Sequence, residues 1–194
     1  NGFPLIAYGD DTNGNLKLAI CDDTCATPNL VTIDASANDV GNRNALTALD
    51  DFVVVAHHDA TAGALKLTRC RTNATVCNAV SSVTADATAT SGEGIAIARM
   101  ANLVPVIFYT RNFEVRAIRC TELACSGIAP SNPMLGGLTP TFLSATRDAL
   151  GDPSFVVVSV PNGTINAIRC ADLQCAIPGL QGLTFGAGSP GFNA

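Results

Sequence analysis

The sequence predicts an all-β protein built from four tandem repeats, and three observations support this prediction. An apolar-rich run that ends in a cysteine recurs four times, and its leading cysteines are 49, 50 and 50 residues apart. A fixed period of this size is typical of repeat architectures. Thr, Val, Ile, Gly, Asn and Asp are plentiful while Lys, Glu and Gln are scarce, which favours strands and turns over helices. The chain is 47% apolar but only 5% aromatic, with no Trp, so an aliphatic core of closely packed strands is expected.

The first repeat, residues 1–40, is expected to contain three strands. Asn13-Gly14 lies between two apolar runs, and this pair favours a two-residue type I′ hairpin because both residues tolerate positive φ. The expected strands are residues 3–8, 16–21 and 29–33.

The later repeats, residues 41–90, 91–138 and 139–188, are each expected to contain four strands. Their second strands read as continuous apolar runs without alternation, which predicts burial on both faces. The expected strands are 44–49, 52–57, 64–70 and 80–84; then 94–98, 104–109, 113–120 and a poorly patterned segment near Ile128; then 141–145, 154–160, 164–170 and 180–185.

Four-stranded units of about 50 residues in tandem are the signature of a β-propeller, in which each unit is one blade. The first repeat lacks a first strand, whereas residues 189–194 follow the last outer strand. We therefore expect this C-terminal strand to complete the first blade and close a four-bladed ring, which removes an open sheet edge. The whole chain, residues 1–194, is then a single domain.

Eight cysteines in four close pairs indicate an oxidising compartment. Zinc sites usually separate paired ligands by a uniform two to four residues, whereas three, six, four and four residues intervene here. This variation favours structural disulfides over a metal site, with free thiols as the remaining alternative. Because the repeat selects one set of pairs, we expect a secreted or cell-surface protein with one bond in each blade. The expected bonds are Cys21–Cys25, Cys70–Cys77, Cys120–Cys125 and Cys170–Cys175.

Charge and hydropathy narrow the classes of partner. The net charge is −5 and no dense run of Lys or Arg exists, which argues against nucleic acid and anionic membranes. The longest apolar stretch, around Leu103 to Tyr109, is too short to span a bilayer, so no membrane insertion is expected. No cofactor is expected either.

The loops at the end of the blades opposite the cysteines carry the most chemically versatile side chains. His57 and His58 are neighbours on an expected strand and point to opposite faces, so they do not converge on one metal ion. A role for one histidine with a distant carboxylate remains open, as does the plainer alternative that these residues only satisfy turns and solvent. No Gly-x-Ser-x-Gly or His-Glu-x-x-His motif occurs, so an enzyme is not expected. The candidate binding residues are Tyr8, Asp10, Asp11, His57, His58, Asp59, Tyr109 and Arg111.

An arginine precedes three of the leading cysteines. These residues, Arg69, Arg119 and Arg169, could form a basic ring of binding sites. The favoured alternative is that each arginine braces its hairpin through a carbonyl or a carboxylate.

Two segments of the first repeat are similar to a known repeat family: residues 2–10, Gly-Phe-Pro-Leu-Ile-Ala-Tyr-Gly-Asp, and residues 14–21, Gly-Asn-Leu-Lys-Leu-Ala-Ile-Cys. They resemble the tandem repeats of bacterial extracellular β-propellers with a cysteine pair in each blade. The resemblance covers nearly the whole chain at decreasing quality, and Ser159 and Pro161 stand in the fourth copy where Tyr8 and Asp10 stand in the first. It implies a fold and an extracellular setting but no activity, since propellers host many functions.

These observations predict a non-enzymatic extracellular module for interaction or structure, with a protein or glycan ligand. One alternative is self-assembly through the terminal strands, in which the C-terminal strand completes a neighbour's first blade or two chains form an eight-bladed ring. Another is a carbohydrate-binding propeller, which the absence of Trp weakens because sugar faces favour aromatic stacking.

Overall fold

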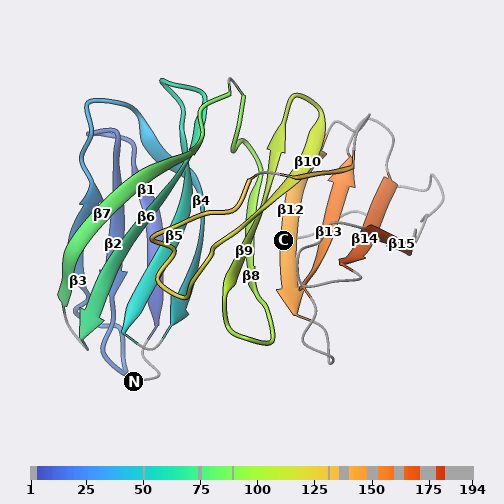
Figure 1. Cartoon of the computed structure of the whole chain (residues 1–194). Helices are drawn as coiled ribbons and strands as arrows, with labels where there is room; N and C mark the ends of the chain where they lie inside the picture. The colour runs from blue at the N-terminus through green and yellow to red at the C-terminus, as the bar shows by residue number, and fades with distance from the viewer. Residues whose placement is uncertain are drawn as a thin grey trace.

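The computed structural model of the chain contains only β-strands as regular structure in the part that it describes (Figure 1). No helix occurs there, and so none that could cross a membrane. The described residues are 4–49, 51–73, 76–88, 90–130, 132–135, 140–147, 153–159, 164–170 and 178–181.

These residues form four antiparallel sheets, each a simple meander in chain order. Sheet 1 consists of β1 (Leu5–Asp10), β2 (Asn15–Ile20) and β3 (Asn29–Asp34). Sheet 2 consists of β4 (Val40–Leu49), β5 (Phe52–Asp59), β6 (Ala64–Asn73) and β7 (Val76–Asp86). Sheet 3 consists of β8 (Ile95–Arg99), β9 (Pro105–Arg111), β10 (Glu114–Arg119) and β11 (Asn132–Leu135). Sheet 4 consists of β12 (Pro140–Arg147), β13 (Pro153–Ser159), β14 (Thr164–Cys170) and β15 (Pro178–Gln181).

The sheets stand side by side in a row, with sheets 1 and 2 at one end and sheet 4 at the other (Figure 1). The first strand of each sheet contacts the first strand of the next, from β1 through β4 and β8 to β12. Three strands in sheet 1 and four in each other sheet match the strand plan predicted from the sequence. The expected closing strand, residues 189–194, lies outside the described residues, so ring closure within the chain stays a prediction.

The outer strand of sheet 3 lies further along the chain than expected. Ile128 makes only an isolated bridge with Cys120, and the outer strand β11 begins at Asn132. Pro133 lies within β11 and has no N–H to donate, which is tolerated because β11 pairs only with β10 at the sheet edge.

The core lies between the sheets, and it explains the continuous apolar runs of the second strands. Val53 and Val55 of β5 pack with Leu18 of β2 between sheets 1 and 2, whereas Val54 and Ala56 pack towards sheet 3. Because alternate side chains of β5 face two different sheets, both faces of the strand are buried. The prediction of burial on both faces is therefore confirmed for β5.

Two glycines allow the chain to cross closely from one sheet to the next. Gly41 leads into the second sheet with φ of +91°, and an added Cβ would lie only 3.0 Å from the Cα of Leu16. Gly92 leads into the third sheet with the same φ, and its Cβ would lie 3.3 Å from the Cα of Leu65. Positive φ and close backbone approach both require glycine here. The connections from sheet 1 to sheet 2 and from sheet 2 to sheet 3 therefore have the same local structure.

The first hairpin differs from the expected type I′ turn. Asp10 pairs with Asn15, so four residues rather than two form the loop, and the amide of Gly14 donates to the Asp10 carbonyl at 2.8 Å. Only Gly14 adopts positive φ, at +65°. The Asp10 carboxylate accepts from the Thr12 amide and from Asn13 Nδ2, and this side-chain capping stabilises the longer loop.

Three of the four expected disulfides are present: Cys21–Cys25, Cys70–Cys77 and Cys120–Cys125. Cys170 is also disulfide-bonded, but Cys175 lies outside the described residues, so the fourth pairing stays a prediction. No described cysteine is free.

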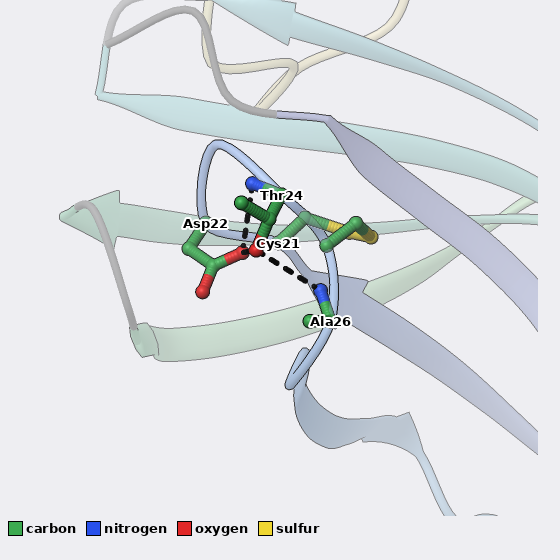
Figure 2. The surroundings of a disulfide bond; sticks show 5 residues. Cys21, Asp22, Thr24 and Ala26 are labelled. Atoms are coloured by element: carbon green, nitrogen blue, oxygen red, sulfur yellow. Dashed lines mark hydrogen bonds between the residues drawn. A yellow bond between two sulfur atoms is a disulfide. The ribbon is translucent and has the colours of Figure 1, made fainter.

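A hydrogen-bonded turn supports the first disulfide (Figure 2). The amide of Thr24 donates to Asp22 Oδ1 at 3.1 Å, and the amide of Ala26 donates to Thr24 Oγ1 at 3.4 Å. Cys25 adopts positive φ, which returns the chain towards Cys21 within a loop of three residues.

Replacing both Cys70 and Cys77 by Ser is expected to lower the free energy of unfolding by about 2 kcal/mol, because the short loop loses its cross-link in the unfolded state. Urea unfolding of the variant beside the unchanged chain measures the difference. Peptide mapping without reduction supplies the control, and bonds that join cysteines of different repeats would contradict the assigned pairing.

Candidate functional site

The polar side chains predicted to form a binding face instead meet between sheets, and the first group lies between sheets 1 and 2. Asp34 ends β3 and is buried, and its carboxylate accepts hydrogen bonds from Lys66 Nζ of β6 and from the Ser36 amide. Burial alone would raise the pKa of Asp34, but these hydrogen bonds, led by that of Lys66, hold it below its usual value. Asp34 therefore joins sheet 1 to sheet 2 as a carboxylate.

His57 lies in the same group and is fully buried. Its Nε2 lies 2.9 Å from Thr68 Oγ1 and 3.6 Å from Asp34 Oδ2. Burial lowers the pKa of His57 to about 4, with the nearby charge of Lys66 adding to the effect against the attraction of Asp34. The imidazole is therefore neutral at pH 7.

The group does not have the geometry of a hydrolytic triad. A triad needs the carboxylate on one imidazole nitrogen and the nucleophile on the other, whereas here Thr68 and Asp34 both lie beside Nε2. His57 Nδ1 is buried with no hydrogen-bond partner in the described structure. Thr68 is fully buried and also shares a hydrogen bond with Ser82 Oγ at 2.6 Å. The arrangement fits a structural tie better than an activated nucleophile.

A second group of the same design lies between sheets 2 and 3. Asp86 ends β7, and its Oδ2 accepts from the Tyr109 hydroxyl at 2.6 Å and from Arg111 Nη1 at 3.1 Å, both on β9. Burial would raise the pKa of Asp86, but the hydrogen bonds from Tyr109 and Thr88, with the charge of Arg111, lower it to about 2.

The two groups use equivalent positions of the repeat. His57 pairs across strands with Lys66, and Tyr109 pairs in the same way with Arg116. In both cases the side chain on the second strand reaches the aspartate that ends the outer strand of the preceding sheet. Tyr8 holds this position in sheet 1, where it pairs with Lys17. We call this arrangement the inter-sheet carboxylate contact: Asp34 with Lys66 and His57, and Asp86 with Tyr109 and Arg111.

The remaining predicted site residues are mostly engaged locally. Asp10 pairs with Lys17 at 2.6 Å, and this hydrogen bond is the main reason that the pKa of Asp10 falls to about 2. Asp59 is buried and accepts from Asn38 Nδ2 at 2.7 Å and from the Ala62 amide at 2.9 Å.

The last two predicted residues do not join either group. Asp11 is exposed in the first hairpin loop. His58 is half-buried on the face of β5 opposite His57, as its alternation predicts, and burial lowers its pKa. The structure thus brings together His57 with Asp34, and Tyr109 with Arg111, but it does not assemble all eight residues into one site.

Arg69 braces the structure through a carbonyl, as favoured from the sequence, but that carbonyl belongs to the next sheet and not to its own hairpin. Its Nε donates to Ser81 Oγ at 2.8 Å, and its Nη1 donates to the Ala124 carbonyl at 3.1 Å. Ala124 belongs to the disulfide loop of the next sheet, so Arg69 braces sheet 3 against sheet 2.

A cleft of about 370 Å³ opens beside this brace, at the disulfide end of sheets 2 and 3. Its volume lies within the range of small-ligand pockets. Sequence reasoning placed binding at the opposite end and missed this cleft, because three separate loops build it and none carries a motif. Arg99 donates from its Nη1 to the Ala48 carbonyl at 3.2 Å and ties the rim to sheet 2. The lining residues are Leu49, Asp51, Phe52, Arg99, Leu103, Glu122, Leu123 and Ala124.

Within the described ranges, no cluster of three His, Cys, Asp or Glu side chains could hold a metal ion. The carboxylates of Asp34 and Asp10 each bind a lysine, Lys66 and Lys17 respectively.

No protein-family model matches the chain, and no curated protein sequence matches it. Among solved structures, the crystal structure of a triple arginine-to-alanine mutant of AofleA from Arthrobotrys oligospora aligns with 95% of this chain and 74% of its own. The two are 8% identical and superpose with a TM-score of 0.35. We draw neither fold nor function from a similarity of this size, and the resemblance to bacterial propeller repeats stays a prediction.

Stability is expected to fall as the pH is lowered from 6.5 towards 4, because the unfolded state protonates His57 at its ordinary pKa while the folded state holds it neutral. The full contribution, about 3 kcal/mol, is present above pH 6.5 and is lost by pH 4. Urea unfolding at several pH values measures it, and His57→Gln should flatten this part of the profile.

His58→Gln serves as the comparison, since His58 is only half-buried and should contribute less. An unchanged pH profile in His57→Gln would show that the imidazole is not buried in its neutral form.

Proposed function

We propose that the chain is a non-enzymatic extracellular interaction module whose four sheets are the blades of a β-propeller. Four consecutive antiparallel meanders, packed through their first strands, support the architecture. Disulfide bonds within the sheets fit an oxidising, extracellular compartment.

The observation that carries the non-enzymatic role is the use of the versatile polar side chains as ties between sheets. His57 is neutral and fully buried, and Asp34 and Asp86 are held by cationic and hydroxyl donors. General acid–base catalysis needs a group within hydrogen-bond reach of a substrate. Fully buried groups that bond to one another support the structure instead.

The cleft at the disulfide end is the proposed recognition surface. Leu103 and Leu123 are partly exposed at its rim, and Asp51, Glu122 and Arg99 place both signs of charge around them. Apolar side chains with a few charged groups are typical of surfaces that bind another molecule.

The cleft does not favour the carbohydrate alternative. Among the described residues that line it, Phe52 is the only aromatic one, and the Arg71 guanidinium lies over its ring, 5.2 Å from the centroid. The cation therefore occupies a ring face on which a sugar would otherwise stack.

Self-assembly is the second candidate function, and the exposure of sheet 1 favours it. Ile6 is 50% exposed and Leu30 is 58% exposed on the face of sheet 1 that points away from sheet 2. A blade in a closed ring is covered on both faces, so this face needs a cover.

The chain is expected to show no turnover of chromogenic esters, glycosides, phosphates or peptides above the level of a reduced and heated sample. His57→Gln should change only its stability. Turnover in the unchanged chain that disappears in a folded, cooperatively unfolding His57→Gln variant would contradict the non-enzymatic role.

A further inference from the structure

The outer face of sheet 1, the face turned away from sheet 2, carries an apolar row across all three strands. Ile6 of β1 pairs with Ala19 of β2, and Ala19 pairs with Leu30 of β3, so the three side chains lie in one line. Tyr8 and Lys17 form the next row on the same face. Ile6 and Leu30 are half or more exposed, which is unusual for aliphatic residues aligned across a sheet.

The equivalent face is covered in the next two sheets. Val55 of sheet 2 and Ile107 of sheet 3 hold the position of Ile6, two residues before His57 and Tyr109, and both are 0% exposed. Val55 packs against sheet 1, and Ile107 packs against sheet 2. The outer face of sheet 1 is therefore equivalent to the faces of sheets 2 and 3 that pack against a preceding sheet.

At the other end of the row, β12 of sheet 4 carries an exposed apolar side chain on the face that points away from sheet 3. Leu143 and Ala145 of β12 pack into the core beside sheet 3, so Phe142, their neighbour on the strand, faces the other way and is 64% exposed. In sheet 3 the register with the second strand places Gly94 at the corresponding position, and Leu143 of sheet 4 lies beside it. Phe142 thus places a large apolar side chain where the junction of sheets 3 and 4 has no side chain.

We propose that the outer face of sheet 1 binds the free face of sheet 4 of a second copy of this chain, head to tail. The proposal rests on the blade architecture proposed above and names the partner that covers the bare face. The two faces lie at opposite ends of the row, so a second copy can join them without rearranging the described sheets (Figure 1). In this contact the Phe142 side chain of one copy covers the exposed Ile6 and Leu30 side chains of the other.

The contact between copies is mainly apolar. Lys17 holds the position of Lys66, but it pairs with Asp10 of its own sheet and not with a carboxylate of a preceding sheet. β15, Pro178–Gln181, contains no acidic residue. Because this junction lacks the inter-sheet carboxylate contact, it is weaker than the inner junctions, and the assembly is reversible and insensitive to salt.

The contact joins two different faces, so each copy can bind one neighbour at each end, and variants of the two faces should differ from their mixture in solution mass. The unchanged chain is expected to exceed its single-chain mass of 19.8 kDa by a factor of two or more as concentration rises, measured by light scattering after size-exclusion chromatography. Ile6→Glu damages one face and Phe142→Glu the other, so each variant alone should remain at the single-chain mass. An equimolar mixture should form a two-chain species, because each variant keeps the face that the other lacks.

Phe113→Glu is the matched control, since Phe113 is 68% exposed in the loop between β9 and β10, away from both end faces. It should assemble as the unchanged chain does. A single-chain mass for the unchanged chain at every concentration would overturn the proposal, as would assembly of either Ile6→Glu or Phe142→Glu alone. Neither result bears on the non-enzymatic role, which the substrate panel tests separately.

Discussion

The inter-sheet carboxylate contact is the interaction on which the order of the sheets depends. An aspartate at the end of one outer strand accepts hydrogen bonds from the second or third strand of the next sheet, at Asp34 and again at Asp86. Apolar packing between two sheets has little direction, whereas a charge-assisted hydrogen bond fixes distance and angle. Each such bond contributes about 1.5–3 kcal/mol, and losing one partner leaves a buried charge unpaired. The aspartates therefore set how one sheet sits on the next.

The fold was largely predictable because its signals are local in sequence. The cysteine period marked each repeat, and the short spacing of Cys70 and Cys77 identified a bond that the structure contains. The partners of the polar residues were not predictable, because Asp34 and Lys66 are 32 residues apart and belong to different repeats. Their contact depends on sheet packing, which no local pattern in the sequence encodes.

In the candidate site, too, features set by neighbouring residues were predictable, whereas contacts between distant residues were not. Alternation correctly separated His57 from His58, and the apolar run predicted a buried strand, but no local pattern placed the His57 side chain beside Asp34 of the preceding sheet. The cleft escaped prediction because Phe52, Leu103 and Leu123 come from three separate segments of the chain, and Arg69 braces two of the sheets that carry them. In the first hairpin, side-chain capping by Asp10 outweighed the usual preference of Asn-Gly for a two-residue turn.

The most direct test of this account is a double-mutant cycle between Tyr109→Phe and Asp86→Asn, which measures the coupling across sheets 2 and 3 by urea unfolding at neutral pH. The hydroxyl–carboxylate distance of 2.6 Å, with both groups buried, predicts a coupling free energy of about 1.5 kcal/mol or more. A coupling below about 0.5 kcal/mol, the scatter of independent sites, would show that the aspartate does not hold the two sheets together.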